Sequence, residues 1–301
     1  MIALAAVSWG TTGTATTFLV RDTAISPLAI GVARLALAAL VLGILARRAG
    51  SLRIARAELV PCIAMGATMA VFQAGYFSAV VLVGVALTAL IAICSAPLII
   101  AVLARIFLAE RLSPLGMAAL ALGVTGTAML IGGTTAITGA RTYAAGVLLA
   151  LAAGASYATY VVIAKTSVAR SQPLPVAAWT FAAGTLWLAP VLAAVAPSSS
   201  QLATGWPWLL YLGVVTTGLA YAAYTTGLQS TSAAGAGIVA LLEPLTATLL
   251  GVALFNERFG PTGIVGGLLL LSAVTLLIRE ETRIRRVAVR TLARNARSHS
   301  D

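Results

Sequence analysis

The chain has 301 residues, of which 60% are hydrophobic and only 9% are charged, and its mean hydropathy is +1.02. Soluble domains carry about 25% charged residues, so this composition excludes a soluble globular protein and indicates an integral membrane protein. The net charge is +11, and the two cysteines, Cys62 and Cys94, lie in apolar runs, which argues against a disulfide framework or a zinc site.

Ten apolar runs follow one another along the chain, and each is long enough to cross about 30 Å of hydrocarbon at 1.5 Å per residue. They are residues 3–20, 27–46, 58–80, 85–108, 113–132, 144–164, 174–196, 206–227, 232–255 and 260–278. Only Gly84 interrupts the long apolar stretch between the third and fourth runs. The first run lacks the basic segment and the cleavage site of a signal peptide. We therefore predict an all-α polytopic membrane protein with ten transmembrane helices.

Basic residues divide unequally between alternate breaks. If both termini are cytoplasmic, the cytoplasmic segments hold Arg47, Arg48, Arg53, Arg56, Arg105, Arg111, Lys165, Arg170, Arg279, Arg283, Arg285, Arg286, Arg290, Arg294 and Arg297. The other side then holds only Arg21, Arg141 and Arg258. Because cytoplasmic loops carry an excess of Lys and Arg, we predict that both termini are cytoplasmic. The basic tail predicts contact with anionic membrane lipid, and we expect no nucleic-acid partner.

The chain contains an internal repeat. Pro97, Glu110, Arg111, Pro114 and Gly116 each lie 147 residues before Pro244, Glu257, Arg258, Pro261 and Gly263. With five spans in each half, the second half enters the membrane from the opposite side, so the two repeats are predicted to be inverted. We assign residues 1–136 to the first repeat, 137–278 to the second and 279–301 to a basic cytoplasmic tail. Inverted repeats around a central site are typical of secondary transporters.

These repeated residues, together with Ser8-Trp9-Gly10 and Arg34, make the two halves resemble the EamA repeats of the drug/metabolite transporter superfamily over nearly all of residues 3–278. The resemblance implies a multi-pass carrier of the bacterial inner membrane that exports small molecules by alternating access. The ten-span amino-acid exporters are the most similar branch, with YddG-type export of aromatic amino acids as the narrower prediction, and hydrophobic or small hydroxy amino acids also considered. Another metabolite or drug as substrate, or a sensor or scaffold that transports nothing, stays open.

Pro97 and Pro244 fall about halfway along the fourth and ninth runs. Proline lacks the N–H that bonds to the carbonyl four residues back, so the carbonyls of Ile93 and Ala240 lose a partner or the helix bends. We predict kinked helices that border the site and flex between states. A static packing kink is the alternative.

Glu243 is the acidic residue nearest the middle of the predicted bilayer, where a charge costs about 3 kcal/mol or more. We predict that it binds a substrate ammonium or exchanges a proton. The alternative is a neutral carboxyl that hydrogen-bonds to backbone loosened by Pro244. Its counterpart in the first half is Ala96, so the role is not symmetric.

Four predicted helices carry aromatic and small polar residues at helical spacing, which places each set on one face. The predicted substrate-binding residues are Trp9 and Thr12, then Gln73, Tyr76 and Phe77, then Tyr157 and Tyr160, and finally Tyr221 and Tyr224. Apolar surfaces with a few hydroxyl or amide groups suit an amphipathic small molecule. Packing between helices is the alternative for each aromatic residue.

Four charged residues have other expected roles. Glu110 and Glu257 precede the fifth and tenth runs, so we predict that each caps the helix that follows it. Lys165 is expected to anchor the inner end of the sixth run. Arg34 lies seven residues into the second run, where it could snorkel outward, pair with Asp22 or bind a substrate carboxylate.

The sequence offers little for catalysis. Its one histidine, His299, lies in the tail, and no phosphate-binding P-loop is present, so we expect neither an enzyme nor an ATP-driven pump. We predict no metal and no cofactor. A monomer is expected, with a dimer left open.

Overall fold

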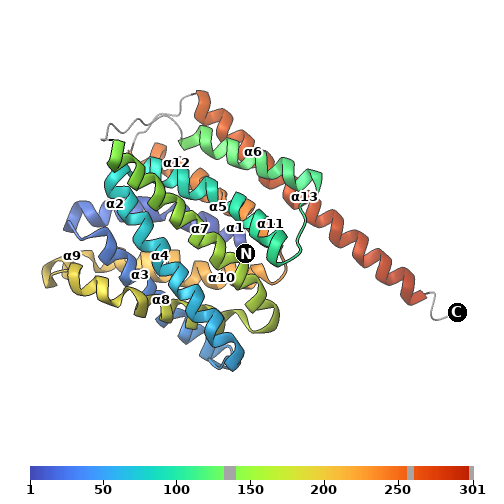
Figure 1. Ribbon diagram of the computed structural model, residues 1–301, viewed down its shortest axis with the longest axis horizontal. Helices are drawn as coiled ribbons and strands as arrows, with labels where there is room; N and C mark the ends of the chain where they lie inside the picture. The colour runs from blue at the N-terminus through green and yellow to red at the C-terminus, as the bar shows by residue number, and fades with distance from the viewer. Residues whose placement is uncertain (132–139, 256–260, 298–301) are drawn as a thin grey trace.

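The computed structural model describes residues 1–131, 140–255 and 261–297 (Figure 1). Every regular element in these ranges is helical, which confirms the predicted helical class. The predicted boundary between residues 136 and 137 lies outside the described residues, as do Glu257 and Arg258. The predictions on them stay predictions.

The first half contains six α-helices and one 3-10 turn within residues 1–131. They are α1 (Ile2–Gly10), α2 (Thr12–Thr23), α3 (Pro27–Arg48), η1 (Arg56–Glu58), α4 (Leu59–Val83), α5 (Val85–Phe107) and α6 (Pro114–Ile131). Gly84 separates α4 from α5 with a φ of +83°, a left-handed conformation that glycine adopts without steric cost. The break predicted at Gly84 is therefore confirmed.

The second half is more irregular. It contains α7 (Ala140–Arg170), α8 (Pro173–Val195), α9 (Ser199–Leu210), the π-helix η2 (Tyr211–Leu219), α10 (Ala220–Leu228), α11 (Ala233–Ala240), α12 (Leu242–Phe255) and α13 (Pro261–Arg297). The segment predicted as 206–227 starts at Ser199 instead, because Ser198 and Gln201 cap each other's backbone N–H groups in a capping box.

Within the described ranges, six helices are long and apolar enough to cross a membrane: 27–48, 56–83, 141–170, 173–195, 233–251 and 261–279. Two shorter apolar helices cover 91–107 and 114–129. These helices support a membrane protein, whereas the count of ten crossings stays a prediction. One reason is local: the run 3–20 breaks at Thr11 into α1 and α2, and the run 206–227 is divided among α9, η2 and α10.

The helices pack in pairs that join the two halves. α3 packs on α8, α4 on α7, and α6 on α13, and the α6 and α13 pair forms one edge of the bundle in Figure 1. Glycines permit the close approach: a Cβ on Gly66 would lie 2.6 Å from the Gly184 nitrogen, and one on Gly126 would lie 2.6 Å from the Gly266 oxygen. Such small residues are where membrane helices gain packing energy.

Two charged side chains hold the connection between α10 and α11. Lys165 Nζ on α7 donates to the carbonyl oxygens of Leu228 and Thr231, both at 2.8 Å. Glu110 accepts the backbone N–H of Ala233 through both carboxylate oxygens, at 3.1 and 3.0 Å, and that of Ala234 at 3.4 Å. We call these contacts the Lys165–Glu110 clamp. A cation at the end of one helix and an anion at the start of the next are both favourable for the helix dipoles.

The clamp corrects one prediction and refines another. Glu110 does not cap the helix that follows it, because Ser113 Oγ accepts the N–H of Gly116 there. It caps α11 of the other half instead. Lys165, expected as an anchor of its own helix end, binds carbonyls of the neighbouring helix.

A second polar link lies at the same end of the bundle, where α4 begins and α7 ends. Arg170 Nε lies 3.1 Å from Glu58 Oε1, and Glu58 is only 3% exposed. Arg170 is 62% exposed, and without it the buried Glu58 carboxylate would be left uncompensated, so this contact ties the first half to the second. We refer to this end of the bundle as the Lys165 end.

The glycine contacts give a first prediction. Gly66→Ala and Gly126→Ala should each destabilise the folded protein by about 1–3 kcal/mol, because backbone atoms must move to admit the methyl group. The thermal unfolding temperature in detergent is the measurement. Gly43→Ala is the matched control, since a Cβ there meets nothing within 4 Å. Equal unfolding temperatures for all three variants would contradict the packing described.

The clamp gives a second prediction. Lys165→Met keeps the aliphatic stem but leaves the Leu228 and Thr231 carbonyls without their donor, so the free energy of unfolding should fall by about 1–3 kcal/mol. Thermal unfolding in detergent measures this loss. Arg48→Met removes an exposed charge and should have no measurable effect. If both variants unfold at the same temperature, the clamp contributes nothing to stability.

Candidate functional site

Aromatic residues from both halves meet around Trp9 of α1. The ring centroid of Trp9 lies 5.1 Å from that of Tyr221, 5.2 Å from that of Tyr224 and 6.2 Å from that of Tyr157. Tyr160 joins them through an edge contact with Tyr221 at 5.8 Å. We call these five residues the Trp9 cluster. Helices α1, α7 and α10 each supply a part of it, so three of the four predicted faces converge.

The fourth predicted face joins the cluster through a residue that the sequence analysis missed. Tyr76 stands 5.7 Å from Phe77 and 5.8 Å from Phe72, and Phe72 lies 5.9 Å from Tyr157. Phe72 precedes Tyr76 by four residues, so the same helical spacing that selected Tyr76 could have found it. Phe181, which contacts Tyr221 at 4.6 Å, carries no polar neighbour pattern that would have indicated it.

Several polar atoms of the Trp9 cluster are buried without a partner. Among the described residues, Trp9 Nε1 and the hydroxyls of Tyr157, Tyr160 and Tyr224 have no hydrogen-bond partner. The Tyr157 and Tyr224 hydroxyls interact electrostatically at short range, but they do not reach hydrogen-bonding geometry. A buried polar atom left unpaired costs about 1–3 kcal/mol. Four such atoms in one cluster indicate a place for bound water or a ligand.

Arg34 of α3 faces the interior of the bundle. Its Nε donates to Thr217 Oγ1 at 3.1 Å, and its charge interacts with Glu243, Tyr76 and Tyr221. Of the three roles that the sequence left open for Arg34, snorkelling to the outer interface is therefore not the one that the structure shows.

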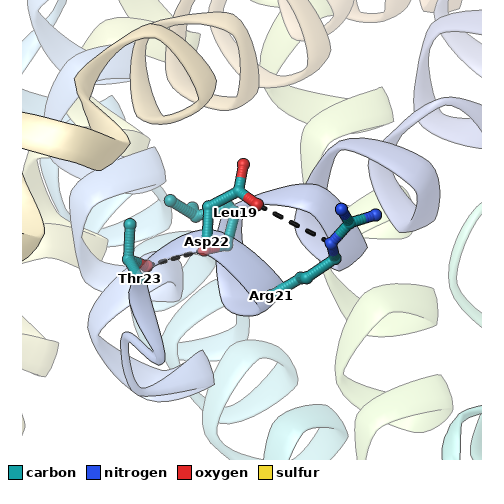
Figure 2. A network of polar contacts seen from close by, with 4 residues as sticks. All are labelled: Leu19, Arg21, Asp22 and Thr23. Atoms are coloured by element: carbon teal, nitrogen blue, oxygen red, sulfur yellow. Dashed lines mark hydrogen bonds and ion pairs between the residues drawn. The ribbon is translucent and has the colours of Figure 1, made fainter.

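The pairing of Arg34 with Asp22, the second role left open, is also not observed among the described residues. Figure 2 shows that Asp22 lies beside Arg21, with 3.9 Å between Arg21 Nε and Asp22 Oδ1. Both side chains are largely exposed, at 76% and 45%. The same figure shows Thr23 Oγ1 donating to the Leu19 carbonyl at 2.6 Å, which closes the last turn of α2.

Glu243 lies in the first turn of α12, directly after the break at Leu241. Its charge interacts with Arg34, Tyr76 and Tyr221, so Glu243 lies beside the Trp9 cluster. Within the described ranges its carboxyl forms no hydrogen bond and no ion pair, so the backbone bond expected as the alternative is not present. A Cβ on Gly10 would lie 2.6 Å from the Glu243 carbonyl oxygen, so α1 packs directly on this turn.

The remaining predicted residues have separate positions. Gln73 Nε2 donates to the Gly31 carbonyl at 3.3 Å, which links α4 to α3 one turn before Arg34. Thr12 lies beyond the break at Thr11, and its buried hydroxyl has no partner among the described residues. Its position next to the cluster remains a prediction.

The two repeated prolines differ in their surroundings. α5 continues from Val85 to Phe107 through Pro97, whereas Pro244 follows the interruption between α11 and α12. Gly237 of α11 packs on Pro97, since its Cβ would lie 3.5 Å from the Pro97 Cα. Equivalent positions in the two halves therefore have unlike backbone conformations.

Broken or widened helices surround Arg34 and Glu243. Thr217, which holds Arg34, belongs to the π-helix η2 and donates its own hydroxyl to the Leu212 carbonyl at 2.7 Å. π-helical segments occur frequently at functional sites, and discontinuous helices near the membrane midplane form transporter sites. The arrangement can therefore hold a small molecule that has both charged and aromatic parts.

Comparison with known proteins points to a transporter family. The model of the EamA-like transporter family matches residues 1–132 and 144–279. The uncharacterized transporter YwfM of Bacillus subtilis (strain 168) is 34% identical over 280 residues, which are 90% of this chain and 92% of that protein. A probable terminal-alkyne amino-acid exporter of Streptantibioticus cattleyicolor is 28% identical over 67% of each chain.

A solved crystal structure of a protein has the same fold as this chain. Its TM-score is 0.79 at 23% sequence identity, and the match covers 94% of this chain and 97% of that one. At this identity the likeness concerns the fold alone. The family match extends over both halves, and on that ground this chain belongs to the EamA-like transporter family.

Proposed function

We propose that this chain is a secondary transporter that exports amino acids across the bacterial inner membrane by alternating access. The observation that carries the proposal is the Trp9 cluster beside Arg34 and Glu243, with aromatic surface, unpaired hydrogen-bonding groups and two opposite charges drawn from both halves. Family membership supports transport, and the Streptantibioticus relative named as a probable amino-acid exporter supports the substrate class.

The proposed substrate has an apolar or aromatic side chain. The Trp9 cluster, extended by Tyr76 and Phe77, offers ring faces to that side chain, and Gln73 and Thr12 stay as proposed polar contacts. Glu243 is proposed to bind the ammonium group. Sites of this kind bind amphipathic small molecules through a mostly apolar lining with few polar groups.

The proposed topology is ten spans in two inverted repeats, with both termini cytoplasmic. The packing supports it, because α3 with α8 and α6 with α13 are contacts between equivalent helices of the two halves. Swapping the two halves turns the contact of α4 with α7 into the contact of α10 with α1, and both contacts are present. A two-fold axis between inverted repeats requires this pattern.

The Lys165 end is proposed to be the cytoplasmic end, closed in this conformation. The Lys165–Glu110 clamp and the Glu58–Arg170 pair both lie at this end. Each is proposed to link segments that separate when this end opens. The helices at Pro97 and Pro244 are proposed to bend alternately. In this conformation Pro97 lies in a continuous helix, and Pro244 lies beside a break.

Counterflow in proteoliposomes tests the proposed activity. Purified protein is reconstituted with unlabelled amino acid inside, and labelled phenylalanine, leucine or serine is offered outside without an ion gradient. Exchange above that of protein-free liposomes is expected, with phenylalanine and leucine ahead of serine because of the aromatic lining. If folded protein exchanges no amino acid, then drugs, other metabolites and a role without transport replace the proposal.

Glu243 gives a prediction of its own. Glu243→Gln keeps the shape but removes the charge, and a hydrogen bond to a charged group contributes about 1.5–3 kcal/mol, so half-saturation for amino-acid exchange should rise about tenfold or more. The control is Asp22→Asn, which removes an exposed acid paired only with Arg21 among the described residues. Unchanged exchange by Glu243→Gln at every pH would remove both the ammonium-binding and the proton-exchange role.

A further inference from the structure

We infer that Arg34 and Glu243 form a subsite selective for zwitterions, in which the Arg34 guanidinium binds the α-carboxylate and the Glu243 carboxylate binds the α-ammonium. The inference rests on the proposed transport function. It assigns Arg34 to the binding site and names the substrate class as free α-amino acids.

The first observation is the uncommitted part of the Arg34 guanidinium. Arginine has five N–H donors in a planar fork, and here only Nε donates, to Thr217. Among the described residues no group accepts a hydrogen bond from the two Nη atoms. Neither atom is among the fully buried polar side-chain atoms that lack a partner. The side chain is half-buried. Thr217 thus fixes one edge of the fork, and the other edge is free to bind a carboxylate through two parallel bonds.

The second observation is that two opposite charges influence each other without forming an ion pair. Arg34 and Glu243 interact electrostatically inside the bundle, yet their N and O atoms are not within the 4.0 Å of an ion pair. Within the described ranges, Glu243 has no other ion pair. Opposite charges in an apolar interior are costly unless something neutralises them. A molecule with both charges, placed between them, would neutralise both.

The chemistry of an α-amino acid suits this pair of charges. Its carboxylate and ammonium are attached to the same carbon, so one small group can meet Arg34 on one side and Glu243 on the other. A primary amine would leave the Arg34 charge uncompensated and would be repelled by it. A carboxylate without an ammonium group would leave the Glu243 charge uncompensated and would be repelled by Glu243. The pair therefore favours zwitterions over both single-charge analogues.

The surroundings set one orientation for the bound molecule. Tyr221 interacts with both charges, and its ring stands 5.1 Å from Trp9, so a side chain leaving the α-carbon would point toward the Trp9 cluster. Each charge also has an apolar counterpart in the other half. Ala96 corresponds to Glu243, and Ala182 lies 148 residues after Arg34, the spacing that relates Pro27 to Pro175. The repeat therefore offers no second, reversed charge pair.

The test compares competitors that share one side chain. Counterflow of labelled phenylalanine by wild-type protein is measured against phenylalanine, phenethylamine, which lacks the carboxylate, and 3-phenylpropionate, which lacks the ammonium. Leucine, isopentylamine and 4-methylpentanoate form a second series. Each single-charge analogue should compete about tenfold or more less strongly than the amino acid. This part needs no variant, so it holds even if substitutions impair folding.

Variants then assign each charge. Arg34→Gln should weaken competition by phenylalanine about tenfold or more while phenethylamine competes as well as before or better. Arg34→Lys keeps the charge without the fork and should recover part of the loss. Glu243→Gln should reduce the penalty on 3-phenylpropionate instead. The control Arg21→Gln removes an exposed guanidinium and should leave all ratios unchanged. Thermal unfolding in detergent checks that each variant is folded.

Two results separate the inference from the function on which it rests. If wild-type protein exchanges amino acids but phenethylamine competes as well as phenylalanine, or if Arg34→Gln keeps the wild-type ratio, the zwitterion subsite is refuted and amino-acid transport stands. If wild-type protein exchanges neither amino acid, the proposed function fails, and the inference fails with it.

Discussion

The need to satisfy polar groups inside an apolar bundle governs this structure. Hydrocarbon offers no water to hydrogen-bond a free backbone or side-chain group, so each must find a partner within the protein. At the α10–α11 connection the chain meets this need, because Lys165 and Glu110 bind the free backbone groups on both sides of it. Around Trp9 it does not, and four of the eight unpartnered buried side-chain atoms in the described ranges belong to that cluster. The contrast distinguishes scaffold from site.

The two halves share their packing but not their charges. Helices α3 and α8, and likewise α6 and α13, meet as equivalent pairs. Arg34, Glu243 and Lys165, however, correspond to Ala182, Ala96 and Thr17. Under the proposed function, similar packing would let the two halves exchange conformations, and unlike charges would give the bound molecule one orientation. A duplicated fold can thus acquire substrate preference through a few substitutions without altering its helix contacts.

The sequence predicted the helices well because their signals are local. Hydrophobic length, proline and glycine located most elements, and the break at Gly84 follows from its left-handed backbone. The break at Thr11 and the π-helix were missed, since no composition change marks them, whereas the interruption at Leu241 lies next to the kink predicted at Pro244. Glu110 was assigned to the wrong helix because its partner lies 123 residues away. Arg34 shows the same limit: its position in the run gives depth, but only packing against η2 sets its direction.

Aromatic spacing found most of the Trp9 cluster because a helix places residues i, i+3 and i+4 on one face. What spacing cannot give is which hydroxyls stay unpaired, since that depends on several helices at once. The hydrogen-bonded charged groups lie at one end of the bundle, and this position affects how that end opens. Bonds at a bundle end can be replaced by water when that end opens, so opening the Lys165–Glu110 clamp costs less free energy than leaving its carbonyls unpaired in the closed state, as Lys165→Met does. Groups at the centre have no such replacement while both ends are closed. Under the proposed function, a bound molecule that satisfies them would stabilise a closed intermediate, which a carrier passes through on each transfer.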